Sequence, residues 1–373
     1  MTVEVRTKKQ EKQFLEVPKR LYKDDEHWIC PLDNDIKQIF DPIKNNFHQH
    51  GVCARWILIE NELVVGRIAA FINYEKAFSL QFKVGGIGFF ECINSYSASK
   101  ELFDTAKLWL QAKGIEVMDG PINFGENDNF WGLLIEGFTP PSYGMNYNKP
   151  YYRDLFINYG FKIIYEQITN HLDVNRPFPE RFNRIAEWVS QKQGYTFKHF
   201  SKKKLPEFAK HFMEIYNDAW GDFENFKPIK METIMESFKK MRFIMDEKLI
   251  WFAYIDNVPV SFIMVIPDAN QLIRKFNGKM TIWNSFRFIL NKRKVNRLRA
   301  IVMGTKKNYQ KHGLESALFI KLKQYVIPLN RYKELELSWV GDFNKEMLSI
   351  HKATGAKPGK KHATFRYIFE TVK

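Results

Sequence analysis

A glycine among basic and polar residues, where an apolar segment gives way to a helical pattern, is the feature of this sequence that points most directly to chemistry. Residues 300–303 are apolar and partly β-branched, which predicts a buried strand. A polar run from Gly304 to His312 follows, and from Leu314 apolar residues recur at helical spacing. A strand, a glycine loop and a helix start direct free backbone N–H groups and the positive end of the helix dipole at one point. That arrangement binds phosphate.

The junction between strand and helix reads Gln-Lys-His-Gly-Leu-Glu-Ser from Gln310 to Ser316. It resembles the pyrophosphate loop of the GNAT acetyltransferase superfamily, whose pattern is Gln/Arg-x-x-Gly-x-Gly/Ala at a helix start. Gln310 and Gly313 match this pattern, whereas Glu315 stands where the family has Gly or Ala. A carboxylate in the first helical turn suits the helix dipole but repels a diphosphate. The motif therefore supports the fold more strongly than it supports cofactor binding.

The sequence predicts two halves that share one order of elements. We expect strand pairs at 52–71 and 249–266, strand–helix units at 86–113 and 299–327, and helices ending in glycine at 150–160 and 344–355. This order resembles a tandem GNAT protein over nearly the whole chain, which implies an α/β fold with mixed (α+β) sheets and two GNAT-like acyl-CoA N-acyltransferase domains. The prolines of 175–179 mark the boundary, so the expected domains are residues 1–174 and 175–373.

The first half lacks the phosphate motif. Its strand ending at Cys92 passes almost directly into a helix, with Ser95 as an N-cap, and no Gln/Arg-x-x-Gly element intervenes. We therefore expect the first domain to pack against or shape the site, and the second to hold the acyl-CoA.

In the second half the resemblance implies an acyl-CoA site. The pantetheine arm would pair with the strand end, the diphosphate would meet the loop N–H groups, and lysines including Lys307 would add charge-assisted contacts. The alternative is an ordinary strand-to-helix connection with a solvated basic loop. The residues expected at the acyl-CoA are Val302, Met303, Gly304, Lys306, Gln310, Lys311, His312, Gly313, Leu314, Ser316 and Asn344.

Two residues are candidates for acid–base catalysis. The helix that begins at Asn344 resembles the family pattern Asn-x-x-Ala-x-x-Leu-Tyr-x-x-x-Gly-Phe, with Asn344 and Gly355 matching. His351 falls on the family's tyrosine, often the acid that protonates the departing thiolate, and an imidazole can also donate a proton. Glu336 on a central strand is the candidate base for the acceptor amine. A helical histidine without a task and a core-edge carboxylate are the structural alternatives.

One wall of an acceptor pocket is expected where a helix ends in aromatic and amide side chains. Asn217, Trp220 and Phe226 are the candidates. Packing of an amphipathic helix end on the sheet would explain Trp220 equally well.

Composition places the chain among globular proteins with acidic partners. Of the 373 residues 45% are apolar, and 57 Lys and Arg against 42 Asp and Glu give a net charge of +15. The most basic stretch, Arg274 to Arg299, is interleaved with Trp283, Phe286 and Leu290, and suits an anionic membrane surface, an RNA backbone, or a solvated helical insertion. Three cysteines without CxxC spacing predict no disulfide framework and no metal site. The N-terminal residues lack an apolar signal segment, and we expect a cytoplasmic protein.

The sequence thus predicts an acyl-CoA-dependent N-acyltransferase, with acetyl-CoA as the first choice of donor and a small-molecule or peptide amine as acceptor. Direct transfer is expected, because no cysteine or serine nucleophile lies beside a base. Two alternatives stay open: a non-catalytic protein that keeps the GNAT fold as a binding scaffold, and a Fem-like aminoacyl-tRNA-dependent transferase.

Overall fold

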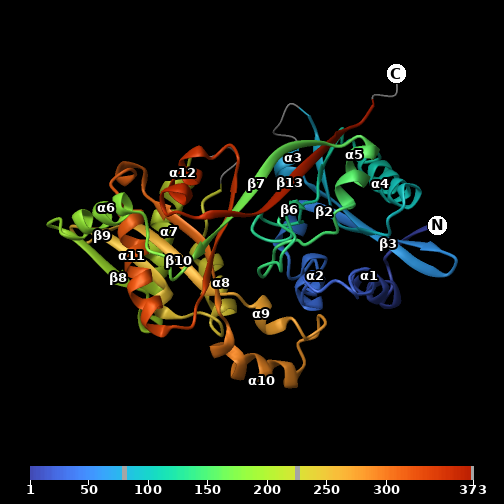
Figure 1. Cartoon of the computed structure of the whole chain (residues 1–373). Helices are drawn as coiled ribbons and strands as arrows, with labels where there is room; N and C mark the ends of the chain where they lie inside the picture. The colour runs from blue at the N-terminus through green and yellow to red at the C-terminus, as the bar shows by residue number, and fades with distance from the viewer. Residues whose placement is uncertain (78–81, 223–226, 371–373) are drawn as a thin grey trace.

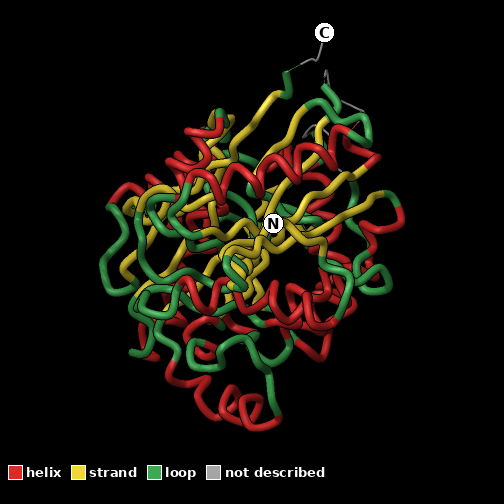
Figure 2. Tube along the Cα trace, turned by 90° about the vertical axis from the view of Figure 1, so that its right-hand side faces the viewer, coloured by secondary structure: helices red, strands yellow, loops and turns green. Residues whose placement is uncertain are grey.

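The strands of both halves join into one continuous sheet. The structure is a computed structural model that describes residues 1–77, 82–222 and 227–370. These residues form a mixed sheet of 13 strands in the order β1-β2-β3-β4-β5-β13-β7-β12-β11-β10-β9-β8, with β6 paired to β13 off this path. Helices lie on both sides of the strands (Figures 1 and 2). The predicted α/β fold with mixed pairing is confirmed.

The first half supplies seven strands and five α-helices among the described residues. Its β2–β3 hairpin turns at Asn61 and Glu62, both with positive φ, as the tight turn of a hairpin requires. The elements are β1 (Thr2–Glu4), α1 (Lys8–Leu21), α2 (Asp33–Ile39), η1 (Asn46–Gln49), β2 (Gly51–Glu60), β3 (Leu63–Asn73), α3 (Tyr74–Ala77), β4 (Val84–Cys92), α4 (Tyr96–Gln111), β5 (Val117–Gly120), β6 (Leu133–Glu136), α5 (Tyr152–Tyr159) and β7 (Lys162–Asp173).

The second half repeats this order, and its hairpin turns in the same way at Asp256 and Asn257. Helix α5 is capped by Gly160, and α12 is capped by Thr354 with Gly355 directly after it; both glycines have positive φ, which confirms the two predicted helix ends. The elements are α6 (Glu180–Ser190), β8 (Tyr195–His199), η2 (Lys202–Lys204), α7 (Leu205–Trp220), α8 (Met231–Met241), η3 (Glu247–Leu249), β9 (Ile250–Ile255), β10 (Val258–Pro267), α9 (Asn270–Ile273), α10 (Ile282–Asn291), η4 (Lys292–Lys294), β11 (Arg297–Thr305), η5 (Lys307–Tyr309), α11 (Leu314–Val326), η6 (Ile327–Leu329), β12 (Glu334–Gly341), α12 (Lys345–Ala353) and β13 (Lys357–Ile368).

Each half completes its sheet with the last strand of the other. Strand β7 ends the first half but pairs with β12, and β13 ends the chain but pairs with β5. The two exchanged strands also pair with each other and cross the middle of the molecule (Figure 1). The apolar cores follow the exchange: Ala363 and Phe365 of β13 pack in the core of the first half, and Leu172 of β7 packs in that of the second.

Residues 119–138, expected to be loop because they are rich in Gly, Asn and Asp, contain the short strand β6. That expectation was wrong at 119–120, which belong to β5, and at 133–136, where Leu133 and Leu134 pair with β13 and are buried. Among the described residues no helix has the length and apolarity to cross a bilayer. Nor do three His, Cys, Asp or Glu side chains of that part of the chain gather where they could hold a metal ion.

Candidate active site

The parallel strands β11 and β12 separate at a defined level. They pair from Arg297 with Glu334 to Ala300 with Leu337 and no further, although both strands continue. On β11 the register against β10 skips Ile301, which is therefore an extra, bulged residue. The register of β12 against β7 shifts over Ser338 and the residue after it. Both strands lose their regular register at the same level, and beyond it they are no longer paired with each other. This unpaired stretch between β11 and β12 is called the opening below.

The two sides of this opening carry backbone and hydroxyl groups. The Ser338 hydroxyl lies at its base, where its one O–H is within hydrogen-bond reach of the carbonyls of Ala300 and Ile301, the latter at 3.0 Å. Val302 and Met303 are half-buried and pair on their other edge with β10. The segment 302–304, predicted to pair with a pantetheine arm, therefore lies on the edge of β11 that faces the opening.

The loop after β11 leads into the first turn of α11. Gly313 has φ 77° and is the N-cap, and a Cβ there would meet Ile185 Cγ2 at 2.5 Å. Glycine is thus required both by the backbone conformation and by the close approach of α6. Among the described residues, the backbone N–H groups from Lys311 to Glu315 have no hydrogen-bond partner. Five unpaired donors at a helix start can bind an anion, and the binding of a diphosphate there stays a prediction.

Glu315 lies in the first turn of α11, among the residues with unpaired N–H groups. The Thr305 hydroxyl donates to its carboxylate at 2.7 Å, and the Ser261 hydroxyl lies 2.8 Å from that of Thr305. A side-chain carboxylate therefore links the end of β11 to the first turn of α11. Gln310 also turns inward, with its amide nitrogen 3.3 Å from the Thr305 carbonyl. The unpaired N–H groups of the loop favour an anion, whereas the negative charge of Glu315 opposes one.

Three lysines surround the loop, and each has an acidic neighbour. Lys306 lies 3.8 Å from Glu214, Lys307 lies 2.5 Å from Asp222, and the exposed Lys311 lies 3.8 Å from Glu346. These ion pairs reach the surface and are weak enough for an arriving anion to exchange with them. The other residues predicted to contact the acyl-CoA differ in exposure. His312 is exposed, whereas Leu314 and Ser316 are buried in the packing of α11.

The helix that carries His351 begins at Asn344, whose side chain accepts from the Met347 N–H at 3.1 Å and so caps α12. His351 is buried, and its Nδ1 lies 3.1 Å from the amide nitrogen of Asn170. Burial lowers the pKa of His351 to about 4, which makes it neutral near pH 7. The proposed proton donor therefore has a structural explanation, and its catalytic role stays a prediction.

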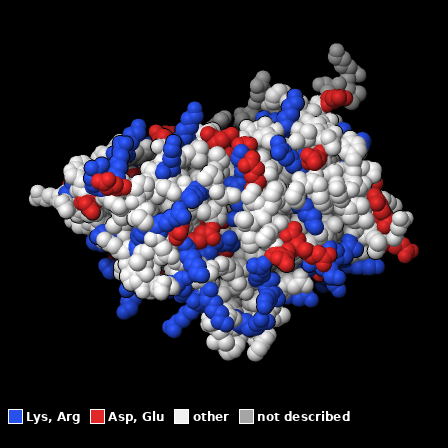
Figure 3. Space-filling view, viewed as in Figure 1, with Lys and Arg blue, Asp and Glu red and all other residues white. Residues whose placement is uncertain are grey.

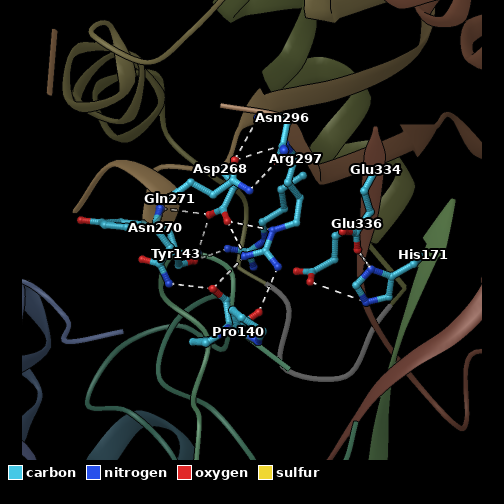
Figure 4. Close-up of polar contacts among 12 residues, drawn as sticks. Pro140, Tyr143, His171, Asp268, Asn270, Gln271, Asn296, Arg297, Glu334 and Glu336 are labelled. Carbon is cyan, nitrogen blue, oxygen red and sulfur yellow. Dashed lines mark hydrogen bonds and ion pairs between the residues drawn. The ribbon is translucent and has the colours of Figure 1, made fainter. Parts of the chain in front are cut away.

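Glu336 belongs to a buried network of charges at the join of the two halves (Figure 4). Its carboxylate lies 2.8 Å from Lys360 Nζ and 3.8 Å from His171 Nε2. Burial would raise the pKa of Glu336, but the charges of Lys360, Arg297 and Arg299 outweigh this and hold it well below its ordinary value. A carboxylate with so low a pKa is a poor proton acceptor. The role of Glu336 as base stays a prediction, and its buried ion pair with Lys360 is the structural alternative.

Of the residues predicted to form a wall of the acceptor pocket, one has a structural role and one lies at the opening. Asn217 exchanges two hydrogen bonds with the backbone of Ile229, at 2.8 and 3.2 Å, so its amide positions the chain after α7. Trp220 lies against Gly304 at the end of β11, where a Cβ would meet its ring at 2.5 Å, and Tyr216 stacks on it with centroids 4.5 Å apart. Trp220 therefore lies beside the opening. Phe226 falls outside the described residues.

The corresponding opening of the first half is filled. Strands β4 and β5 pair only up to Gly86 with Asp119, after which the chain turns through Gly120 and Ile122. The N–H of Ile122 donates to the Ile87 carbonyl at 2.7 Å, and a Cβ on Gly86 would meet the Ile122 side chain at 2.3 Å. Backbone and an isoleucine thus occupy the gap, so the first half has no room for a donor at this position.

Sequence reasoning missed Asp128, which belongs to the segment that follows β5. It is exposed, yet the protein around it excludes enough water to raise the pKa of its carboxyl against the opposing charge of Arg299. Burial and the charges of Glu126 and Asp128 also raise the pKa of Tyr216. Asp128 therefore lies within electrostatic reach of the stack on Trp220. The sequence signal was an acid in a Gly- and Asn-rich segment, which gave no clue to its neighbours.

A second feature missed from the sequence holds the two halves together. Arg297, expected in a basic surface patch, is buried and donates to Asp268 at 2.5 and 2.9 Å and to the carbonyls of Pro140 and Pro141 at 3.0 and 2.9 Å (Figure 4). Arg299 is buried too and donates to the Tyr143 carbonyl. The assignment of these two arginines to the surface was wrong, because their charges are used inside the molecule.

Comparison with known proteins supports the architecture. No protein-family model matches the chain. Protein YghO of Escherichia coli (strain K12) is 26% identical over 361 residues, covering 95% of this chain and 92% of that protein. A bacterial ceramide synthase of Caulobacter vibrioides (strain NA1000 / CB15N) is 26% identical over 371 residues, covering 98% and 95%.

Among solved structures, a tandem GNAT protein from the clavulanic acid biosynthesis pathway superposes with a TM-score of 0.59 at 12% identity, covering 100% of this chain and 99% of that one. A match of this extent at so low an identity is a match of folds. The resemblance stated from the sequence is confirmed: the chain has the tandem GNAT fold.

Proposed function

We propose that the chain is an acyl-CoA-dependent N-acyltransferase whose donor site is the opening between β11 and β12. One observation carries the proposal: the two strands stop pairing with each other at Ile301 and Ser338, directly before a loop whose five N–H groups lack partners. An extended arm can pair with the free edge of β11 while a diphosphate meets the helix start. The filled gap of the first half leaves one such site in the described part of the chain.

The reaction proposed is direct transfer to a neutral amine. Acyl-CoA would supply an activated acyl carbon; the C–N bond forms as the C–S bond breaks, and the ammonium proton leaves to a base while the thiolate gains one. Backbone N–H groups at the β11 bulge are suited to stabilise negative charge on the carbonyl oxygen. Asp128 is our candidate base, because its charge acts on Tyr216, which stacks on Trp220 beside the opening, and because its pKa is raised, whereas Glu336 is held in a buried ion pair.

Donor and acceptor are the finer part of the proposal. Acetyl-CoA is the donor expected from the sequence. The full-length similarity to a bacterial ceramide synthase favours a second choice, a long-chain acyl-CoA with a long-chain amino alcohol as acceptor, because a ceramide is the N-acyl derivative of such an amine. Both choices use the same amide-forming chemistry and the same opening.

The test incubates the purified chain with acetyl-CoA or palmitoyl-CoA and a panel of amines that includes sphinganine. Thiol release is followed by a colorimetric reagent and the amide by mass spectrometry. We expect release that depends on the amine, with Asp128→Asn lowering kcat more than tenfold and Glu236→Gln, the same change of charge at an exposed position of α8, leaving it unchanged. Binding of acyl-CoA without transfer to any amine would favour the non-catalytic scaffold, and no binding at all would refute the site.

A further inference from the structure

Helix α10 carries a row of exposed apolar side chains. Ile282 is 93% exposed, Leu290 62%, and Trp283, Phe286 and Ile289 are each more than half exposed. On a helix these five positions fall within roughly a third of the circumference. No residue of α10 is buried. Figure 1 shows the helix at the lower tip of the molecule, and Figure 2 shows it there from the side.

The apolar row is held outward by the opposite face of the helix. Phe288, on that face, packs against the small core of Ile29, Leu32 and Phe276. The turn before α10 is fixed as well, since the Asp33 N–H donates to the Gly278 carbonyl at 2.8 Å. The helix is therefore braced against both halves of the chain, and its apolar row faces away from them.

Cations surround this row. The sequence has no Asp or Glu between Asp268 and Glu315. With Arg297 and Arg299 buried, the basic residues of the insertion that remain exposed or half-exposed are Arg274, Lys275, Lys279, Arg287, Lys292, Arg293 and Lys294. Arg274 also donates to the Glu26 carbonyl. The space-filling view shows the uncharged tip bordered by blue side chains (Figure 3).

We infer that α10 docks the protein on an anionic membrane surface, with its axis in the plane of the interface. An outward apolar face flanked by Lys and Arg is the pattern of interfacial helices, in which aliphatic and aromatic side chains enter the headgroup boundary while cations meet lipid phosphates. The helix has 10 residues, so it lies on the bilayer and does not span it.

The charges and side-chain types favour a membrane over other occupants. A second copy docked on the same face by a two-fold axis would bring two sets of like charges together, which opposes that contact. RNA binding uses cations with aromatic stacking, but Ile282, Ile289 and Leu290 are aliphatic, and Trp283 and Phe286 stack on each other with centroids 5.9 Å apart. This inference does not depend on the transfer reaction, because it concerns binding alone.

Vesicle flotation with the full chain tests it. Vesicles of phosphatidylcholine alone are compared with equal parts of phosphatidylcholine and phosphatidylglycerol. We expect the protein to float with the anionic vesicles and to be released in part at about 0.5 M NaCl. The variant Ile282→Asp/Leu290→Asp should bind at least about 100-fold more weakly, at about tenfold for each apolar side chain. The control Ile43→Asp/Leu108→Asp has the same charge change at side chains that are 90% and 63% exposed, and should bind like wild type.

Three outcomes would overturn the inference. The wild type could stay in the lower fractions with both kinds of vesicle. It could bind a transfer RNA mixture and not vesicles, which would assign the basic surface to nucleic acid. Or light scattering could show an oligomer that the α10 variant dissociates and the control does not, which would make the apolar row a contact between copies.

Discussion

Replacing Glu315 with glutamine is expected to tighten binding of acyl-CoA. The change removes one negative charge from the first turn of α11 and keeps an oxygen that can accept from the Thr305 hydroxyl, now 2.7 Å from the carboxylate. The position is half-buried, so the fold should tolerate an isosteric amide. Wild-type affinity should be correspondingly modest, because the free N–H groups and the carboxylate act against each other.

The size of the effect follows from the charges. Two unit charges about 6 Å apart interact by about 0.7 kcal/mol in water and by about 3 kcal/mol at an effective dielectric constant of about 20. A diphosphate carries about two charges and Glu315 is partly solvated, so we expect a gain of about 1.4 to 3 kcal/mol. That is a Kd lower by about ten- to a hundredfold. Loss of the favourable contact with the helix dipole should cost about 0.3 to 1 kcal/mol of stability.

Isothermal titration of wild type and Glu315→Gln with coenzyme A and acetyl-CoA at low salt measures the difference. Glu232→Gln is the matched control, because Glu232 is an exposed acid in the first turn of α8 and its replacement makes the same change of charge and helix dipole. It should leave Kd unchanged. Equal affinities for wild type and Glu315→Gln would show that no diphosphate reaches the start of α11, and the donor site proposed here would fall.

Three further outcomes are expected. Arg297→Met should cost about 3 to 5 kcal/mol in urea unfolding, because it leaves a buried carboxylate unpaired, whereas the exposed Arg293→Met should stay within about 0.5 kcal/mol. Burial lowers the pKa of His351 from 6.5 in the unfolded chain to about 4. The stability that the neutral imidazole contributes is therefore fully present above pH 6.5 and is lost as the pH falls toward 4. Between pH 6.5 and 4 the free energy of unfolding of His351→Asn should therefore fall by on the order of 3 kcal/mol less than that of wild type. Equal falls in the two proteins would contradict the burial of a neutral His351. Glu336→Gln should destabilise the fold, and adding Lys360→Met should restore both stability and activity if the pair is structural, whereas a catalytic Glu336 would leave the double variant stable but inactive.

Sequence reasoning reached the fold through features that are local in the chain. Tight-turn residues such as Asn61 and Asp256, helix-ending glycines such as Gly160, and apolar periodicity each depend on near neighbours. The pairing partner of a strand, in contrast, is not determined by near neighbours in the chain. The sequence pattern predicts a closing strand at residues 361–369, and β13 (Lys357–Ile368) lies there, yet nothing in that pattern says that it pairs with β5 of the first half.

The candidate site divides in the same way. The loop and Gly313 at the start of α11 followed from a motif, because a strand, a turn and a helix start are contiguous in sequence. The burial of His351 and Arg297 could not be predicted from the sequence, since it depends on elements far away in the chain. Asp128 was missed for the same reason: its raised pKa arises from surroundings that only the folded chain supplies.

The exchange of end strands has a consequence for how the protein can be made. Strand β5 of the first half receives its neighbour β13 only after residue 368 has been synthesised. During translation the first half therefore presents an unpaired sheet edge, and a part of its core that awaits Ala363 and Phe365. A chain cut at residue 174 leaves both fragments with a vacant strand position, so the halves are expected to be soluble only when expressed together.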